Sequence, residues 1–468
     1  MGPAEATAPE RSATSPSAFA ERAATDPALP AIRRQGMGIW SETTWAACAA
    51  DVDGVAAALL TDMQLSDPST GPRPPVALLG STTADALTAT AAAAWASGAP
   101  CAVVDPSAGL GDIAAFVRAS GAVCAFVEDQ EQYDRLVESG AAEQLRRIVV
   151  TDLRGLNDSD DPRLVALADY VADGRARLVA DEGILRGSGP ADRTATALIV
   201  PLPGPEVGMY LSHEHLQDTA ERLICGLGLE PGWSYAIAAT SPSMVSHYLA
   251  LAVLPGLPLI AHVPDRGTDP VSAWREATPD MVALDSAGWE QLAGRVTAAT
   301  GRRTRLVRET VARALRGEAA TGTVESVTRF VVRAAIRRRL GLGRARTALV
   351  LDGCAAPEVV SLCALLGLPL VELYSPPETG PIAVRRLGSD EDFTILPPTD
   401  RHPRTVRSVD GRIEVSGASL FSGYLAGGAA AGPVTCPDRG EVVGDSLRLA
   451  PMPDPTFPNE HSPNEVAR

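Results

Sequence analysis

The chain is predicted to be an α/β protein with doubly wound parallel sheets, and three observations carry this prediction. Short apolar runs typical of buried strands alternate with segments of helical periodicity through most of the 468 residues. The hydrophobic content of 45% and the charged content of 21% are ordinary for a globular protein. The length corresponds to two or three structural units at roughly 150 residues each.

Residues up to 152 show the clearest alternation. A helix is expected to begin near Thr43 or Thr44, and an alanine-rich helix over 82–98 ends at Gly98. Each predicted strand here is followed by a helix, which favours parallel pairing. The strands are expected at 74–80, 101–106, 123–129 and 146–152, and a further helix at 110–121.

The remainder repeats this alternation and then changes character. Ser212 is the predicted N-cap of a helix over 212–228, because its hydroxyl can accept a hydrogen bond from the first turn. Turn residues and alternating apolar positions over 381–449 predict a small β subdomain with a hairpin at 404–417. The strands before it are expected at 234–240, 258–263, 280–285, 347–353 and 369–374.

These patterns divide the chain into five parts. The tails, 1–17 and 450–468, are rich in proline and small or polar residues and are expected to be disordered. A first α/β subdomain is expected to precede a second one, which carries an arginine-rich helical insertion. The boundaries are 18–190 for the first subdomain, 191–380 for the second with its insertion at 301–346, and 381–449 for the β subdomain.

The charge balance sets one segment apart. The formal net charge is −16, which argues against nucleic-acid binding, and all 41 basic residues are arginine. Residues 301–346 nevertheless hold 13 arginines against Glu309, Glu318 and Glu325, a local charge of +10. One interpretation is a pair of amphipathic helices with solvated arginines. The other is a face for an anionic membrane surface or an acidic protein partner.

The cysteines and the apolar runs bear on the compartment. No Cys-x-x-Cys pair occurs, which predicts reduced and mostly buried thiols. The N-terminus lacks the pattern of a signal peptide, and the longest apolar stretch, 248–263, is too short to span a bilayer. We therefore expect a cytoplasmic protein, peripheral at the membrane if the arginines bind lipid. The cysteines are Cys48, Cys101, Cys124, Cys225, Cys354, Cys363 and Cys436.

Seven segments carry a resemblance to a known family. They are FAERAATDPALPAIRRQGMGIWSETTW, FVEDQEQYDRLVE, LRRIVVTDLRGL, LSHEHL, LVLDGCAAPEV, ELYSPPETG and RIEVSGASLFSGYL. Over 18–449 the chain resembles the N-terminal domain of an adenylate-forming (AMP-binding, ANL superfamily) enzyme, and specifically a long-chain acyl-CoA synthetase. The resemblance implies two doubly wound α/β subdomains and a small β subdomain. The family forms an acyl-adenylate from ATP and a carboxylic acid, with Mg²⁺ on the phosphates, and CoA then displaces AMP.

The resemblance fails at the phosphate loop. The family pattern is Tyr-Thr-Ser-Gly-Thr-Thr-Gly-x-Pro-Lys-Gly before Leu-Ser-His, whereas here VPLPGPEVGMY precedes LSH. Val207 stands at the lysine position, and Glu206 brings a negative charge to where a triphosphate would lie. Three prolines remove three N–H donors from a loop that must donate hydrogen bonds. The hydroxyl side chains give way to Pro201, Leu202, Pro203 and Pro205.

The other nucleotide motifs are partly kept. Tyr374 matches the residue that packs on adenine, and Asp438 matches the acceptor for a ribose hydroxyl. Glu378 matches the Mg²⁺ ligand, although one carboxylate without triphosphate oxygens is a poor site for that ion. The segment Gly353-Cys354-Ala355 takes the place of Gly-Gly-Ala. The family's C-terminal lid, with the catalytic lysine and half of the CoA site, is expected to be absent.

Histidines offer no clear replacement site. His213 and His215 have the look of a metal pair, but His-x-His at the start of a helix does not place both side chains on one face. The simpler interpretation is that these two histidines are polar residues at the start of a helix. His247 falls near the family's acyl-binding wall only with a shifted gap. Because no other catalytic or phosphate-binding motif occurs, no catalytic residue is expected.

The leading hypothesis is a catalytically degenerate acyl-CoA synthetase homologue, which binds an acyl or adenylate ligand or a protein partner without adenylating a carboxylate. Besides a decaying gene product with no role, two alternatives stay open. One is an active fatty-acid ligase with atypical motifs and a lid from another chain. The other is a membrane-surface or interaction protein that uses the 301–346 arginines. ATP or AMP, Mg²⁺ and CoA are cofactors only by resemblance, and ATP use is doubtful.

Overall fold

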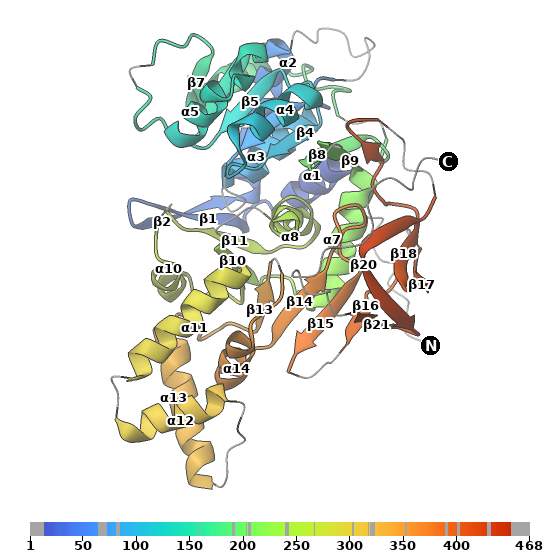
Figure 1. Ribbon diagram of the computed structural model, residues 1–468. Coiled ribbons are helices and arrows are strands. Elements are labelled where there is room, and N and C mark those ends of the chain that lie inside the picture. The colour runs from blue at the N-terminus through green and yellow to red at the C-terminus, as the bar shows by residue number, and fades with distance from the viewer. Residues whose placement is uncertain are drawn as a thin grey trace, which may run out of the picture.

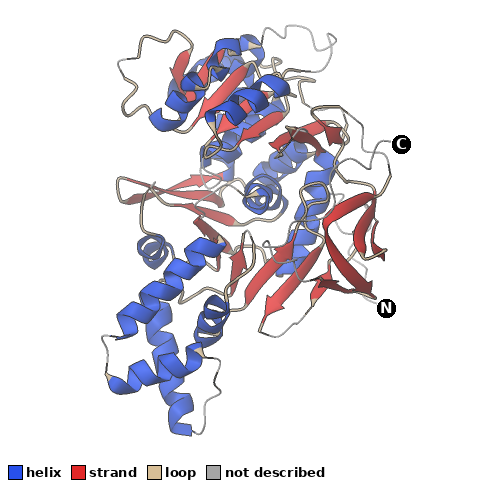
Figure 2. Ribbon diagram, in the orientation of Figure 1, coloured by secondary structure: helices blue, strands red, loops and turns tan. Residues whose placement is uncertain are grey.

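The molecule contains two large sheets flanked by helices, with a helical arm at the bottom and a small β region at the right in Figures 1 and 2. Its computed structural model confirms the predicted α/β class. The described residues are 14–63, 73–80, 85–157, 159–189, 192–202, 204, 207–238, 243–265, 267–301, 304–316, 318, 323–351, 353–388, 392–399, 403–427 and 432–450.

The first sheet has eight strands in the order β19-β9-β8-β4-β3-β5-β6-β7. Its inner strands are parallel and completely buried, which explains why they read as continuous apolar runs. The strands β8 and β9 instead form an antiparallel hairpin, to which β19 is added. The bounds are β3 Val76–Leu79, β4 Cys101–Val104, β5 Cys124–Val127, β6 Arg147–Val150, β7 Leu164–Ala166, β8 Thr196–Pro201, β9 Gly208–Ser212 and β19 Gly423–Tyr424.

The second sheet has 13 strands in the order β17-β18-β20-β21-β16-β15-β14-β13-β12-β10-β11-β1-β2. Strands β1 and β10 to β14 pair in parallel, and the small β region from β15 onward is antiparallel. The bounds are β1 Pro30–Gly36, β2 Ile39–Thr44, β10 Ser234–Ala238, β11 Ile260–Val263, β12 Met281–Leu284, β13 Thr347–Val350, β14 Leu370–Tyr374, β15 Ala383–Leu387, β16 Phe393–Ile395, β17 Arg404–Val409, β18 Arg412–Gly417, β20 Val434–Val443 and β21 Ser446–Leu449.

Helices cover the sheets and build the arm. Helices α11, α12 and α13 project together from the second sheet in Figure 1. Of these, α12 and α13 are the helices that the periodicity of 301–346 predicted. The bounds are α1 Ser15–Thr25, α2 Trp45–Asp62, α3 Asp85–Ala96, α4 Leu110–Ser120, α5 Gln130–Glu138, α6 Leu167–Ala180, α7 His213–Leu227, α8 Met244–Tyr248, α9 Leu254–Gly256, α10 Pro270–Ala277, α11 Ser286–Gly301, α12 Arg305–Leu315, α13 Thr323–Arg339 and α14 Pro357–Leu366. A π-helix, Leu249–Val253, joins α8 to α9, and a 3₁₀ turn spans Ala141–Gln144.

Local signals in the sequence located several boundaries correctly. Thr44 caps α2 by accepting from the backbone N–H of Ala47, and Ser212 caps α7 by accepting from that of His215. The predicted hairpin forms between β17 and β18, with Asp410 and Gly411 at φ 52° and 73°. Positive φ at both positions is what a two-residue hairpin turn requires, and an Asp-Gly pair supplies it.

The structure also corrects the expected organisation. Helix α1 begins at Ser15, inside the stretch 1–17 expected to be disordered, because Thr14 and Ser17 form a reciprocal capping box. The sheets do not follow the boundary at 190. Strands β1 and β2 belong to the second sheet, whereas β8 and β9 complete the first. Periodicity finds strands but does not say which sheet they join.

Several apolar clusters fill the space between these elements. The largest joins α1, α2, α3 and α7 to both sheets, and a separate cluster lies under the small β region. Helices α2 and α6 cross at Gly54 and Gly174, where a Cβ on Gly174 would lie 1.7 Å from the carbonyl oxygen of Gly54.

All seven cysteines are free thiols, and Cys225 and Cys354 are exposed. Within the described ranges, no helix is both long and apolar enough to cross a bilayer.

Candidate nucleotide site and its surroundings

The loop at the phosphate-binding position is a tight hairpin closed on itself. Pro201 pairs with Gly208 at the ends of β8 and β9. The N–H of Leu202 donates to the carbonyl of Val207 at 3.1 Å, and the N–H of Val207 donates to the carbonyl of Gly204 at 3.3 Å. These two backbone donors are therefore used inside the loop. Pro203, Pro205 and Glu206, which the sequence also singled out, lie outside the described residues.

Val207 itself adopts a conformation unusual for its type. Its φ is 60°, in the left-handed region that a β-branched residue rarely enters. Its side chain packs against the apolar cluster of the first sheet, which includes Phe116. An ammonium group at this position in the family would point at phosphate, whereas here the side chain contributes to an apolar surface.

A cavity of about 500 Å³ lies against this hairpin and carries acidic side chains. Pro201, Leu202 and Val207 line one part of it. Its only charged lining residues among those described are Asp105 and Asp112, which are both acidic. Two carboxylates and no lining cation make this cavity unfavourable for a triphosphate, because like charges repel.

Two of the three expected nucleotide residues meet at the small β region. Tyr374 ends β14, and its hydroxyl donates to the carboxylate of Asp438 on β20 at 3.0 Å. The ring is buried and lies 6.2 Å, centroid to centroid, from that of Phe393. Burial, reinforced by Cys436 and Asp438, raises the pKa of the Tyr374 hydroxyl. The tyrosine therefore stays neutral and serves as a donor to Asp438.

Glu378 occupies a separate position with its own partners. Its carboxylate accepts from the hydroxyl of Tyr424 at 3.3 Å, and its carbonyl accepts from the N–H of Phe421 at 3.0 Å. These contacts tie the turn after β14 to the segment that leads into β19. Across the described parts of the chain, no group of three or more histidine, cysteine, aspartate or glutamate side chains has the arrangement of a metal site.

A buried acid that sequence reasoning missed holds the segment around Cys354. Glu372 on β14 accepts from the N–H of Ala355 at 2.7 Å and from Nε of Arg385 at 3.1 Å. The guanidinium of Arg385 also lies 4.5 Å above the ring of Phe393. Glu372 and Arg385 face each other across β14 and β15. That pairing was not visible in the sequence, because nothing indicated the register of these strands.

A buried ionic junction between α7 and the small β region was also missed. Asp218 on α7 accepts from Nε of Arg222 at 2.9 Å and from Nη2 of Arg404 on β17 at 2.7 Å. The hydroxyls of Ser419 and Thr399 donate to the same carboxylate, each at 2.9 Å. We call Asp218, Arg222, Arg404, Ser419 and Thr399 the α7 junction. The i,i+4 spacing of Asp218 and Arg222 was the one available signal.

The opposite charges of the junction stabilise one another in their ionised forms. Burial opposes ionisation of Asp218, but Arg404 and Arg222 hold the pKa of this carboxyl below its ordinary value. Burial lowers the pKa of Arg404 to about 10, which leaves it cationic at neutral pH. Arg404 also donates to the carbonyls of Ser419 and Thr379. The junction therefore fixes the small β region on α7.

The three histidines of interest are buried and structural. Nδ1 of His215 lies 2.9 Å from the carbonyl of Ser419, so it donates there, and Nε2 accepts from the hydroxyl of Tyr248 at 2.9 Å. His213 points elsewhere, with its ring against Trp95. The expectation that these two do not share a face is confirmed. His247 lies 2.8 Å through Nδ1 from the carbonyl of Ser243.

The sequence matches no protein-family model, and comparison with curated proteins finds no match. Solved structures do match. The A domain of carboxylic acid reductase from Segniliparus rugosus, in complex with AMP and a co-purified carboxylic acid, has a TM-score of 0.71 at 14% identity over 93% of this chain and 74% of that one. Coronafacic acid ligase from Pectobacterium brasiliense gives 0.66 at 12% identity, over 93% and 77%. Acetoacetyl-CoA synthetase from Streptomyces lividans gives 0.66 at 13%, over 93% and 66%.

These comparisons confirm the resemblance at the level of the fold. The chain has the α/β architecture found in the N-terminal part of adenylate-forming enzymes.

Proposed function

We propose that this chain is a catalytically degenerate homologue of the adenylate-forming acyl-CoA ligases. It holds an acyl or adenylate ligand, or a protein partner, and does not itself adenylate a carboxylate. The observation that carries the proposal is the closed β8–β9 hairpin, in which the N–H groups of Leu202 and Val207 are bound within the loop.

The chemistry explains why this loop matters. Pyrophosphate release requires donors and a cation aimed at the phosphate oxygens, where charge develops. Val207 supplies no charge, the prolines supply no N–H, and the adjoining cavity presents Asp105 and Asp112. Each of these features weakens phosphate binding independently, so changing one residue is not expected to restore it.

ATP–pyrophosphate exchange with a panel of fatty acids tests the loss of activity. We expect no exchange above background from the purified chain, and none from Val207→Lys. Robust exchange by the unaltered chain would contradict the proposal. Exchange that appears only when a second chain supplies a lid, and disappears in Glu378→Ala, would instead support the active-ligase alternative.

Retention of an adenylate ligand is tested separately by thermal shift. We expect a non-hydrolysable acyl-adenylate analogue to raise the melting temperature, and ATP to have no effect. Tyr374→Phe should reduce the shift because it removes the hydroxyl that holds Asp438 in place, and Asp438→Asn should reduce it because Asp438 matches the acceptor for a ribose hydroxyl in the family. Tyr133→Phe is the matched control, since its hydroxyl also donates to an aspartate, Asp161, at 3.0 Å. An equal loss in the control would exclude a specific role for Tyr374.

A second candidate function is binding to an anionic membrane surface through the arginine-rich arm. Large apolar side chains are exposed on α12 and α13 beside the arginines: Leu306, Val327, Phe330 and Val331. An apolar strip flanked by cations is typical of helices that lie in a bilayer interface. Flotation with phosphatidylglycerol vesicles, lost in high salt and in Phe330→Ser, would support it. Flotation that does not depend on salt would count against it.

A further inference from the structure

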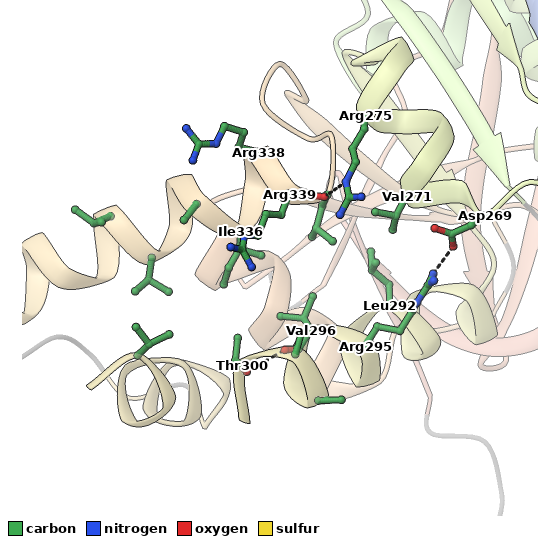
Figure 3. A pocket seen from close by; sticks show the side chains of 17 residues that line it. Asp269, Val271, Arg275, Leu292, Arg295, Val296, Thr300, Ile336, Arg338 and Arg339 are labelled. Atoms are coloured by element: carbon green, nitrogen blue, oxygen red, sulfur yellow. Dashed lines mark hydrogen bonds and ion pairs between the residues drawn. The ribbon is translucent and has the colours of Figure 1, made fainter. Parts of the chain in front are cut away.

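The helical arm borders a half-open cavity far from the nucleotide motifs. It has a volume of about 770 Å³ and lies among α10, α11, α12 and α13 (Figure 3). Small-molecule sites commonly enclose roughly 300–1,000 Å³ with mainly apolar walls and a few polar groups. The arm helices lie between β12 and β13 in the chain, and in Figure 1 they project below the second sheet, away from the small β region at the right. We call this space the arm cavity.

The walls of the arm cavity are aliphatic. Each of the four helices contributes side chains to it, and none of the described residues that line it is aromatic. An elongated flexible chain suits such walls better than a flat ring, which would have nothing to stack on. The main aliphatic residues are Val271, Leu292, Val296, Val307, Val332 and Ile336.

The charges at the cavity are asymmetric. Arg295 forms an ion pair with Asp269 on one side, which neutralises both. On the other side lie Arg275 and Arg339, whereas Arg338 lies at the edge with its guanidinium directed away from the other lining side chains in Figure 3. Among the described lining residues, Asp269 is the only carboxylate. No acid among the described residues forms an ion pair with Arg338 or Arg339. The lining therefore has a surplus of three positive charges beside an apolar space.

We propose that the arm cavity binds a monomeric, single-chain anionic amphiphile, with its alkyl chain between the helices and its head group at Arg275 and Arg339. Charge complementarity commits the site to an anion, because these guanidiniums repel a cationic head and gain little from a neutral one. This site is distinct from the proposed nucleotide site and does not depend on it.

The test is isothermal titration calorimetry of the full chain with sodium decanoate below its micelle concentration. We expect saturable binding of one decanoate per chain. Decan-1-ol and decyltrimethylammonium should bind about tenfold more weakly or not measurably, because they lose charge-assisted hydrogen bonds. Equal binding of all three compounds would overturn the proposal.

Two pairs of variants separate the cavity from the surrounding surface. Ala335→Trp fills the cavity and should abolish binding, whereas Ala334→Trp, on the exposed side of the same helix, should not. Arg275→Gln/Arg339→Gln should weaken decanoate binding about tenfold. Arg305→Gln/Arg308→Gln removes the same charge from α12 outside the cavity and should leave it unchanged. Melting curves of all four variants establish that each one is folded.

The same variants distinguish a cavity from a membrane surface. If the arm binds only lipid bilayers, decanoate will not bind, vesicle flotation will persist in Ala335→Trp, and both arginine pairs will reduce flotation alike. That pattern would overturn the cavity proposal. Decanoate binding that is lost in Ala335→Trp and in Arg275→Gln/Arg339→Gln alone would establish it, whatever the vesicles show.

Discussion

The α7 junction and the helical arm use arginine in opposite ways. The side chains of Arg222 and Arg404 are 2% and 1% exposed and share one carboxylate, whereas Arg305 is 83% exposed and pairs with Glu309 at the surface. Both regions contain an i,i+4 pair at hydrogen-bonding distance. This comparison shows that burial, rather than i,i+4 spacing, decides how much such an ion pair contributes to the free energy of unfolding.

Removing the shared carboxylate gives the largest expected effect. Asp218→Asn keeps the shape of the side chain but leaves two buried guanidiniums without the acid that they share. We expect a loss of about 3–5 kcal/mol in the free energy of unfolding, measured by urea denaturation. If Asp218→Asn lowers the free energy of unfolding by less than about 1 kcal/mol, water must reach the junction. The ion pairs of the junction and of the arm would then contribute more similarly than their burial indicates.

Acid should destabilise the fold next, through His215, whose ring contacts the carbonyl of Ser419 in the junction. Burial, followed by the nearby charge of Arg404, lowers the pKa of His215 to about 3, so the folded state keeps this ring neutral. The unfolded chain, with an ordinary value near 6.5, binds the proton more readily, and stability is lost as the pH falls from 6.5 toward 3. At pH 5 His215 alone should account for about 2 kcal/mol.

The pH dependence is assigned by comparing variants. His215→Gln should flatten the slope of unfolding free energy against pH between 5 and 6.5, because one titrating group is gone. His213, His247 and His262, which are also buried with lowered pKa values, contribute slope in the same direction. The arm contains no histidine between 301 and 346 and is not expected to respond in this range. An unchanged slope in His215→Gln would mean that its ring is protonated in the fold.

The surface pair gives the smallest effect. Glu309→Gln breaks the pair with Arg305, whose Nε lies 2.7 Å from the carboxylate. Solvent already screens these charges, so the free energy of unfolding should change little and depend only weakly on salt. A loss comparable to that of Asp218→Asn would show that the arm is held together by its ion pairs.

The sequence by itself determined the features that depend on neighbouring residues. Apolar runs identified the buried strands, hydroxyl caps placed the starts of α2 and α7, and Asp410-Gly411 predicted the hairpin. The sequence also showed that the prolines lack N–H donors and that Val207 lacks the lysine charge at the phosphate loop, because these properties belong to the residue types themselves. Helical periodicity alone predicted the arginine-rich arm.

Only the tertiary structure decided how distant segments meet. Asp218 and Arg404 are 186 positions apart, and their pairing depends on how β17 docks against α7. The same holds for Tyr374 with Asp438 and for Glu372 with Arg385, because strand register brings these side chains together. The arm cavity likewise exists only after four helices pack. Local sequence dictates conformation, whereas burial and charge partners arise from long-range packing that no single segment encodes.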